Sequence, residues 1–278
     1  MGYHSEELVA ELSEVAMDLR RTVVEMIYRA RSGHPGGSLS AAEIIAALYF
    51  HQLRIDPARP DWPERDRFIL SKGHAAPLLY ATLARRGFFP VEELATLRQL
   101  GSRLQGHPDR LKTPGVEMTA GFLGHGISIG VGLALAARLN GMDYRTYVLV
   151  GDGEIQAGVI WEGAMEAAKY RLSSLTVILD YNDVQLDGSV HEIMPIAPVV
   201  DKWRAFNWAV IEINGHNVRQ VLEALDGAID IHDRPTIIVA HTTKGKGVSF
   251  MENQSCWHGR APNDEEYAQA LAELKGEV

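Results

Sequence analysis

The chain is poor in cysteine, in long apolar runs and in positive charge. Its single cysteine, Cys256, cannot form an intrachain disulfide, which indicates a reducing compartment. The longest apolar stretch, residues 127–139, is interrupted by glycines and Arg138 and is too short to span a bilayer. The formal net charge of −9 argues against general binding of nucleic acid. Together with an amphipathic, acidic N-terminus that is unlike a signal peptide, these features predict a cytoplasmic protein.

Three common site motifs are also missing. No G-x-x-x-x-G-K-[ST] occurs, which excludes a P-loop. A dinucleotide-binding fold requires G-x-G-x-x-G, but Gln156 stands at the third glycine position after Gly151 and Gly153. The sequence has no H-E-x-x-H motif, no close histidine pair on a helix face and no cysteine pair, so the spacing of zinc ligands is absent as well.

Short β-branched runs alternate with helical patterns along the whole chain. Strands are expected at residues 68–70, 147–150, 175–179, 209–213 and 236–240. Helices are expected over residues 5–31, before Gly87, after Gly126, over 218–231 and after an Asn263–Glu266 cap. This alternation predicts the α/β class: a doubly wound, mostly parallel sheet with helices on both faces. Because no repeat or linker divides the chain, we expect residues 1–278 to form a single domain.

Three local patterns refine this outline. Ser40 and Glu43 are spaced as a capping box ahead of the apolar residues 44–48. Gly126 and Gly130 are four residues apart in an expected helix and predict a close approach to another backbone. Residues 101–126 hold six glycines and two prolines with little periodicity, which predicts a long loop. Loops of that length in a compact domain are usually functional.

The Gly151-Asp152-Gly153 turn is the most informative segment. It follows the apolar run 147–150, and Asn182 follows the next apolar run, 175–179. Strand, turn, helix and strand in this order form a βαβ unit, whose strands are parallel and, as neighbours, about 4.8 Å apart. One carboxylate and one amide oxygen at that edge suit a hard divalent cation that also binds phosphate oxygens. The alternative is a plain glycine turn, and the strand context favours the metal–diphosphate site.

Histidine recurs beside glycine in turn-like segments at five positions: His34, His74, His107, His125 and His258. In a parallel α/β sheet the turns after strands meet at one edge, over the ligand crevice. Histidine donates hydrogen bonds to phosphate or sugar oxygens and transfers protons near neutral pH. A single Gly-His pair is typically a solvated turn, but five of them outside the expected helices favour one shared site. The loop 242–247 has two interpretations, a support for a phosphate or a ring and a solvated basic loop.

Six ordered motifs together resemble the N-terminal, diphosphate-binding half of transketolase. They are Ser-Gly-His-Pro-Gly at 32–36, Ser-Lys-Gly-His at 71–74, Gly-His-Pro at 106–108, Gly-Phe-Leu-Gly-His-Gly at 121–126, Gly-Asp-Gly to Asn182, and Trp-His-Gly at 257–259. The resemblance implies thiamine diphosphate as the cofactor, held with Mg²⁺ or Ca²⁺. It also implies a partner, a C-terminal transketolase subunit with the pyrimidine-binding domain, in an α2β2 heterotetramer.

The resemblance further implies a role for each matching residue. The implied metal ligands are Asp152, Asn182 and the backbone carbonyl of Val184. The implied contacts to the diphosphate are His74, Gly153 and His258, and those to the cofactor rings are Gly121 and Leu123. The implied catalytic residues, which face the substrate, are His34, His74, His107 and His258. In this family a two-carbon glycolaldehyde unit passes from a ketose or its phosphate to an aldose. In the family, the glutamate that activates the cofactor lies in the pyrimidine-binding domain. The resemblance therefore implies that this chain is active only with the partner.

Three positions depart from the family pattern: Phe122 replaces a small residue, His125 a glutamine and Ala157 a glutamate. The first two leave the sugar open, and the third puts carboxylate coupling between two active sites in doubt. A transketolase of the pentose phosphate pathway is the leading expectation. The alternatives are a thiamine-dependent enzyme for a sulfosugar or deoxyxylulose-type reaction, a non-catalytic regulatory subunit, and a dinucleotide dehydrogenase with Asp180 as its ribose ligand.

Overall fold

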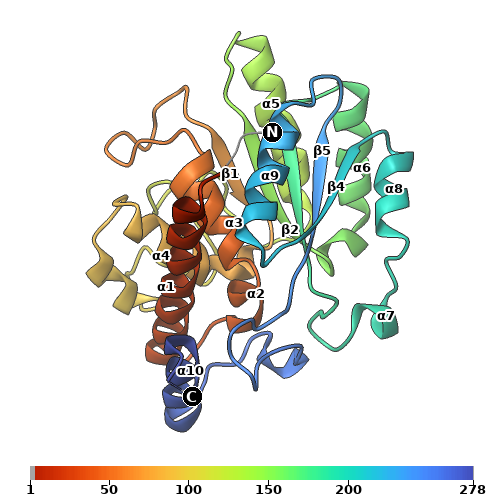
Figure 1. The fold of residues 1–278 in the computed structure, drawn as a ribbon. Helices are drawn as coiled ribbons and strands as arrows, with labels where there is room; N and C mark the ends of the chain where they lie inside the picture. The colour runs from red at the N-terminus through yellow and green to blue at the C-terminus, as the bar shows by residue number, and fades with distance from the viewer. Residues whose placement is uncertain (1–3, 278) are drawn as a thin grey trace.

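A five-stranded sheet in which every strand is parallel forms the centre of the molecule (Figure 1). The computed structural model describes residues 4–277. The strands are β1 (Arg67–Leu70), β2 (Thr146–Gly151), β3 (Leu175–Tyr181), β4 (Ala209–Asn214) and β5 (Thr236–His241), and their spatial order is β1-β2-β3-β5-β4. Every strand expected from the sequence is present, and the predicted α/β class is confirmed.

Helices cover both faces of this sheet (Figure 1). The helices on one face are α1 (Glu6–Ala30), α3 (Ala42–Ala47), α4 (Ala76–Arg85) and α9 (Val218–Ile229). Those on the other face are α5 (His125–Leu139), α6 (Gly158–Lys169) and α8 (Val199–Ala205). Side chains of a strand alternate between the faces, so Leu149 packs in the first core and Val148 and Val150 in the second. Burial on both faces explains why the strands are continuous apolar runs.

The remaining elements are short, apart from the last helix. They are α2 (Pro35–Leu39), η1 (Leu48–Gln52), η2 (Gly73–Ala75), η3 (Val91–Thr96), η4 (Glu154–Gln156), α7 (Val190–Ile193), η5 (Ser255–Trp257) and α10 (Asp264–Lys275). The predicted cap of α10 is confirmed, because the backbone N–H of Glu266 donates to Asn263 and that of Asn263 donates to the Glu266 carboxylate. Within residues 4–277, no helix combines the length and the apolar character that a membrane crossing requires.

The capping box expected at Ser40 and Glu43 is wrong. Helix α3 begins after Ala41, which caps it with no side-chain hydrogen bond. The Ser40 hydroxyl instead donates to the Asp180 carboxylate at 2.6 Å, and Glu43 accepts a bond of 2.6 Å from the buried guanidinium of Arg20. A buried arginine without a counter-ion costs about 3–5 kcal/mol, whereas a helix cap contributes about 1 kcal/mol. The Glu43 carboxylate therefore pairs with Arg20 and does not cap α3.

Glycines in α5 bring this helix against the sheet, as predicted. A Cβ atom on Gly126 would overlap the side chain of Ser71, and one on Gly130 would lie 2.7 Å from Cγ2 of Val148. The segment before α5, from Gly101 to Gly124, contains only turns and bends, which confirms the long loop. Its last residues therefore reach the carboxyl ends of β1 and β2.

Candidate active site

Asp152 and Asn182 lie together at the carboxyl edge of the sheet. Gly151 at the end of β2 pairs with Asp180 in β3, so the residues that follow each strand are adjacent. One oxygen of the Asp152 carboxylate accepts the backbone N–H of Asn182 at 2.9 Å and that of Asp183 at 2.5 Å. The other oxygen accepts the N–H of Gly153 at 2.7 Å. The two turns are thus joined through a single carboxylate.

The amide of Asn182 has a defined orientation. Its Nδ2 donates to Asp180 at 3.2 Å, and its Oδ1 accepts the N–H of Val184 at 3.2 Å. The amide oxygen therefore faces the turn 182–184, on the side away from Asp180. Asp180 itself is fully buried and also accepts hydrogen bonds from Lys72, Ser40 and Thr242. A carboxylate with these partners cannot bind a ribose, so the dehydrogenase hypothesis loses its residue.

The electrostatics of this edge favour a cation. Burial raises the pKa of Asp152 to about 7, and the nearby Asp180 carboxylate adds to the rise. Around it stand the amide oxygen of Asn182 and the backbone carbonyl of Val184. One carboxylate with two neutral oxygens is a donor set that suits Mg²⁺ or Ca²⁺ and leaves further coordination positions for phosphate and water. The residues present therefore fit a metal-bound diphosphate.

A lysine that the sequence analysis did not select faces the same point. Nζ of Lys244 donates to the carbonyl of Val184 at 2.7 Å and lies 2.9 Å from Nδ1 of His258. The lysine is buried, and this burial lowers its pKa to about 8 against the attraction of Asp152. Of the two interpretations of the loop 242–247, support for a phosphate agrees with this position better than a solvated basic loop.

These residues line a cavity of about 290 Å³, which is the candidate cofactor cleft. Among its lining residues are His74, Leu123, Asp152, Gly153, Asn182, Val184, Lys244 and His258. Gly121, the remaining expected cofactor contact, is not among the lining residues, although a Cβ atom on Gly73, which stands between the lining residues Lys72 and His74, would lie 3.2 Å from its backbone nitrogen. The cleft thus contains most of the expected cofactor and metal contacts.

Four histidines form a cluster beside the cleft. The ring centroids of His74 and His258 are 4.9 Å apart, and each lies 5.5 Å from that of His34. His107 is 6.4 Å from His34 and is more exposed. The four imidazoles come from four separate segments of the chain, so only the fold brings them together.

The fifth histidine of the expected set does not join this cluster. His125 begins α5, is exposed and packs on Phe122 at a centroid distance of 4.7 Å. The expectation that all five lie outside helices is wrong, because His125 is the first residue of α5 and His74 lies in the short 3-10 helix η2. The next residue, Gly126, ties the start of α5 to the Ser71 hydroxyl through its N–H, at 3.2 Å.

The clustered imidazoles are neutral at physiological pH. Burial is the main cause that lowers the pKa of His34 to about 4 and that of His258 to about 3. Burial and the Lys72 charge lower the pKa of His74 well below its usual value, and burial together with Arg98 lowers that of His107. A neutral imidazole both donates and accepts, which suits it to hydroxyl groups of a sugar.

A buried glutamate, Glu154, joins three loops of the cleft. One carboxylate oxygen accepts the hydroxyl of Ser71 and the N–H of Gly124, the latter at 2.7 Å. The other oxygen accepts the N–H of Gly151 at 3.0 Å. Sequence reasoning missed Glu154, Lys72 and Lys244. Lys72 lies inside the Ser-Lys-Gly-His motif at 71–74 and Lys244 in the basic glycine loop after a predicted strand, whereas no motif marks Glu154.

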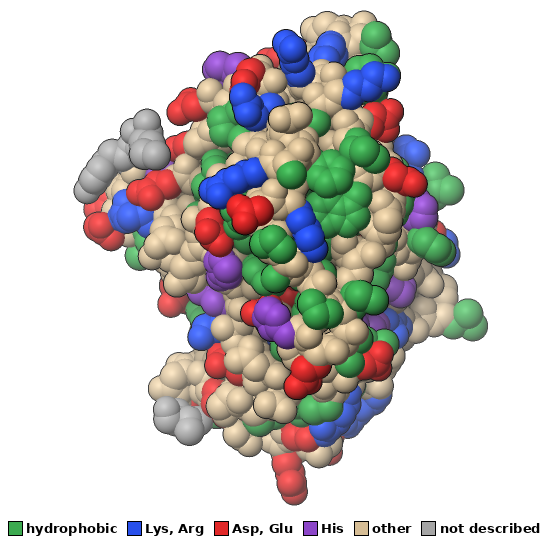
Figure 2. Space-filling view, turned by 90° about the vertical axis from the view of Figure 1, so that its right-hand side faces the viewer, with side chains coloured by type: hydrophobic (Ala, Val, Ile, Leu, Met, Phe, Trp, Pro, Cys, Tyr) green, Lys and Arg blue, Asp and Glu red, His purple; other side chains and the backbone are tan. Residues whose placement is uncertain are grey.

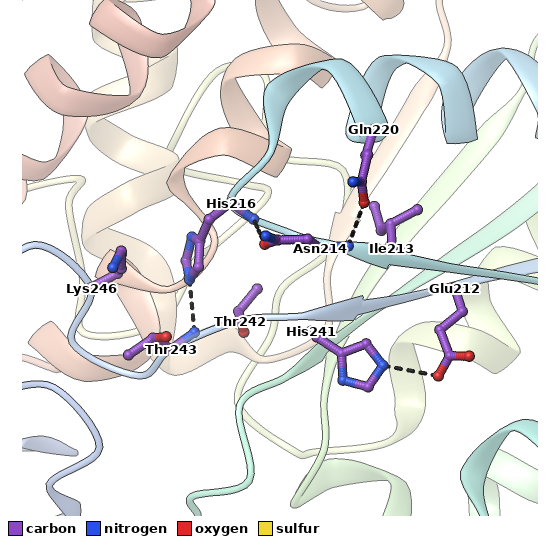
Figure 3. Close-up of a pocket in the computed structure, with 9 residues that line it drawn as sticks. All are labelled: Glu212, Ile213, Asn214, His216, Gln220, His241, Thr242, Thr243 and Lys246. Carbon is purple, nitrogen blue, oxygen red and sulfur yellow. Dashed lines mark hydrogen bonds and ion pairs between the residues drawn. The ribbon is translucent and has the colours of Figure 1, made fainter.

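A second, shallower cavity of about 700 Å³ lies at the ends of β4 and β5 (Figure 3). Its wall includes His216, whose Nε2 accepts the N–H of Thr243 at 2.8 Å. Nδ1 of the same ring lies 3.1 Å from the Glu43 carboxylate. The contact ties the loop that carries Lys244 to α3.

Figure 2 shows one face of the molecule, where histidine and hydrophobic side chains lie close together at the surface.

The fold and the oxygen donors at the carboxyl edge of the sheet define an α/β protein whose residues suit a metal-bound diphosphate. Residues 12–276 match the family described as "Transketolase, thiamine diphosphate binding domain". The chain therefore belongs to the transketolase family of transferases, and its cofactor is thiamine diphosphate with a divalent metal.

Three similar proteins illustrate the match. The 6-deoxy-6-sulfo-D-fructose transketolase subunit SqwG of Clostridium sp. (strain MSTE9) is 45% identical over 96% of this chain and 97% of its own length. An apulose-4-phosphate transketolase subunit of Phocaeicola vulgatus is 42% identical over 93% of this chain and 92% of its own. The transketolase structure from Leishmania mexicana has a TM-score of 0.90 and 35% identity over 95% of this chain, but only 41% of that longer chain is covered.

Proposed function

We propose that this chain is the N-terminal subunit of a two-chain, cytoplasmic transketolase and works as one cofactor-binding domain. Its partner would carry the pyrimidine-binding domain, and the pair would form an α2β2 heterotetramer. Two relatives whose names call them subunits are covered over 92–97% of their length, which supports this division. Phe122 and Leu186, exposed at 76% and 61% near the cleft, supply apolar surface for such a partner.

The proposed metal ligands are Asp152, Asn182 and the carbonyl of Val184. The observation that supports the proposal is the bond from the Asn182 backbone N–H to the Asp152 carboxylate, which joins the two turns at the sheet edge. Gly153, His74 and His258 are the proposed diphosphate contacts, and Gly121 and Leu123 are the proposed contacts to the two rings. Lys244, already 2.9 Å from His258, would supply a positive charge to the diphosphate.

The chemistry at the ketose carbonyl comes from the carbanion that the bound cofactor supplies. The chain's own contribution is to hold the sugar and move its hydroxyl protons. We assign this to His34, His74, His107 and His258. Because burial keeps their imidazoles neutral, each ring offers one donor and one acceptor to adjacent hydroxyl groups.

We propose a ketose with a terminal anionic group as donor. The names of the two relatives specify a sulfonated and a phosphorylated sugar, and both substrates are anionic at one end. Transketolase activity on common sugar phosphates is the leading case, and a sulfosugar is the second. Phe122 and His125, whose rings contact each other, are the two departures from the family pattern that bear on the choice of sugar.

Calorimetric titration with thiamine diphosphate tests the site. With Mg²⁺ and the partner present we expect stoichiometric binding, which is lost with a chelator, while Asp201→Asn on α8 serves as a control that leaves binding intact. Equal heat with and without metal would contradict the site. Donor screening of the reconstituted pair then distinguishes sugar phosphates, sulfosugars and a deoxyxylulose-type reaction. Unchanged turnover in a His34→Gln or His258→Gln pair would instead favour a regulatory subunit.

A further inference from the structure

Arg98 lies between two of the histidine loops. It follows η3 in a left-handed backbone conformation, with φ of 59°, and its N–H donates to the carbonyl of Leu104 at 2.8 Å. This conformation is uncommon for a residue other than glycine and is kept only where the surroundings require it. Here it directs the guanidinium back toward the start of α2, where His34 is found.

The guanidinium makes two contacts with the first loop. Nη1 donates to the Ser32 hydroxyl at 2.9 Å, and Nη2 lies 3.4 Å from Nδ1 of His34. A guanidinium has only donors and stays charged. Nδ1 of His34 must therefore act as the acceptor, and the single proton of the neutral ring must be on Nε2. That edge of the ring faces Gly259, where a Cβ atom would lie 3.4 Å from Nε2.

The second loop packs on the other side of the same group. A Cβ atom on Gly106 would lie 3.0 Å from Cζ of Arg98, so glycine lets the loop lie against the guanidinium without displacing it. The hydroxyl of Tyr80 fixes the same loop by donating to the carbonyls of Gln105, at 2.9 Å, and His107, at 3.1 Å. Arg98 thus lies against Gly106, the residue before His107, and contacts His34, the residue before the start of α2.

We propose that Arg98 is a positioning residue that fixes the Nε2–H tautomer of His34 and holds His34 and His107 in one arrangement. The inference rests on the proposed function, in which these two histidines contact the sugar. With the opposite tautomer, His34 would carry an acceptor at Nε2 in place of a donor. The cation beside them also helps to keep both rings neutral, since Arg98 is one of the causes that lower the pKa of His34 and of His107.

The neighbouring Arg103 provides a matched control. It lies in the same loop and pairs with Glu93 at 2.9 Å, and no hydrogen bond joins it to a histidine in the part of the chain that the structure describes. Both arginines line the same open cavity, of about 1080 Å³. An arginine that merely attracted an anionic substrate would act through KM and would leave the tautomer of His34 unchanged.

The test is a long-range ¹H–¹⁵N correlation spectrum of the full chain with labelled histidine, where His34 is assigned from the loss of its signals in His34→Gln. We expect the Nε2–H tautomer in the wild type and in Arg103→Gln. Arg98→Gln, whose amide both donates and accepts, should produce a mixture of tautomers. In the reconstituted pair it should lower kcat about tenfold or more, while Arg103→Gln stays within about twofold.

An Nδ1–H tautomer of His34 in the wild type overturns the proposal, and this measurement does not depend on the Arg98 variant. So does an Arg98→Gln spectrum identical to the wild type, or a change in KM alone. Arg98→Lys, which keeps the charge and one donor, is expected to restore part of kcat. If instead His34→Gln leaves turnover of the pair unchanged, the proposed role of His34 fails while the tautomer result still stands. The two failures are therefore distinguishable.

Discussion

Nζ of Lys244 donates to the backbone carbonyl of Val184 at 2.7 Å, the oxygen proposed as a metal ligand. The ammonium group therefore supplies positive charge at the point where the divalent ion is expected. Because the pKa of this lysine is lowered to about 8 by burial, its charge is held at a cost in free energy. Metal and diphosphate together would give the lysine a new partner, since the metal takes the carbonyl and the phosphate oxygens accept from Nζ.

Lys244→Met should separate cofactor binding from stability. Loss of a buried charge offsets the two lost hydrogen bonds, so we expect the free energy of unfolding without cofactor to change by less than about 1 kcal/mol. The dissociation constant for thiamine diphosphate should rise about tenfold to a hundredfold, because a charged hydrogen bond to phosphate is lost. Calorimetry and chemical unfolding measure the two quantities. Lys246→Met, which removes an exposed pair with Glu252, is the control and should change neither.

Asp152→Ala should abolish metal-dependent binding of the cofactor. The aspartate is the one charged side chain among the proposed metal ligands, and loss of one partner of a buried charge pair costs about 2–5 kcal/mol, or about thirtyfold to several thousandfold in affinity. Titration of the reconstituted pair with Mg²⁺ and thiamine diphosphate measures it. Cofactor retained at a stoichiometric level in this variant would contradict the assignment. Asp201→Asn, an exposed carboxylate on α8, should bind like the wild type.

The histidine cluster should make stability depend on pH. His34 and His258 have folded pKa values lowered to about 4 and about 3, whereas an unfolded histidine titrates near 6.5. Between these values the unfolded chain binds more protons, so their contribution is fully present above pH 6.5 and is lost as the pH falls toward 4. Asp152, whose pKa is raised to about 7, acts in the opposite sense.

Because these contributions oppose each other, the pH dependence of a variant must be compared with that of the wild type. We expect His258→Gln to lose less thermal stability than the wild type between pH 7.5 and pH 5, as followed by the melting temperature without cofactor. His232→Gln, an exposed histidine outside the cluster, should follow the wild-type curve. Parallel curves for His258→Gln and the wild type would show that the ring does not titrate as its burial requires.

Sequence predicted those parts of the site that depend on local order. Asp152 and Asn182 were placed together because each follows a strand, and neighbouring parallel strands end at one edge. Lys72 and Glu154 could not be found in this way, since their partners, Asp180 and Gly124, are distant in sequence. His125 has the same Gly-His context as the four clustered histidines. Only the packing of α5 separates it from them.

The expected capping box failed for a related reason. Ser40 and Glu43 have the right spacing, but both side chains form bonds with distant residues, Asp180 and Arg20. The spacing of two residues indicates only a local preference for a cap. An unpaired buried charge on another helix, here Arg20 on α1, would cost more than the cap contributes. The cap of α10, at Asn263 and Glu266, formed as predicted, and both of its side chains are near the surface, where no buried partner competes.

Glu154→Gln should loosen the three loops that meet at its carboxylate. An amide places one N–H₂ group against the backbone N–H donors of Gly124 or Gly151, so at least one buried donor loses its partner. We expect a loss of about 1–3 kcal/mol in the free energy of unfolding, together with weaker cofactor binding. Urea denaturation measures the first. Glu162→Gln, an exposed carboxylate on α6, is the control, and an equal effect from both variants would refute a special role for Glu154.

Substitution of two glycines of α5 by alanine should change the free energy of unfolding in opposite directions. A methyl group at Gly130 would lie 2.7 Å from Cγ2 of Val148 and 3.2 Å from Leu175, both in buried strands, so Gly130→Ala must push α5 from the sheet. Overpacking of this kind costs about 1–3 kcal/mol. Gly132 is exposed, a Cβ atom there would meet nothing within 4 Å, and alanine is the better helix former, so Gly132→Ala should gain about 0.5–1 kcal/mol. Because α5 starts beside the cleft, Gly130→Ala should also weaken binding of the cofactor, while Gly132→Ala leaves it unchanged. Equal stability changes in the two variants would mean that the close approach of α5 to β2 does not exist in solution.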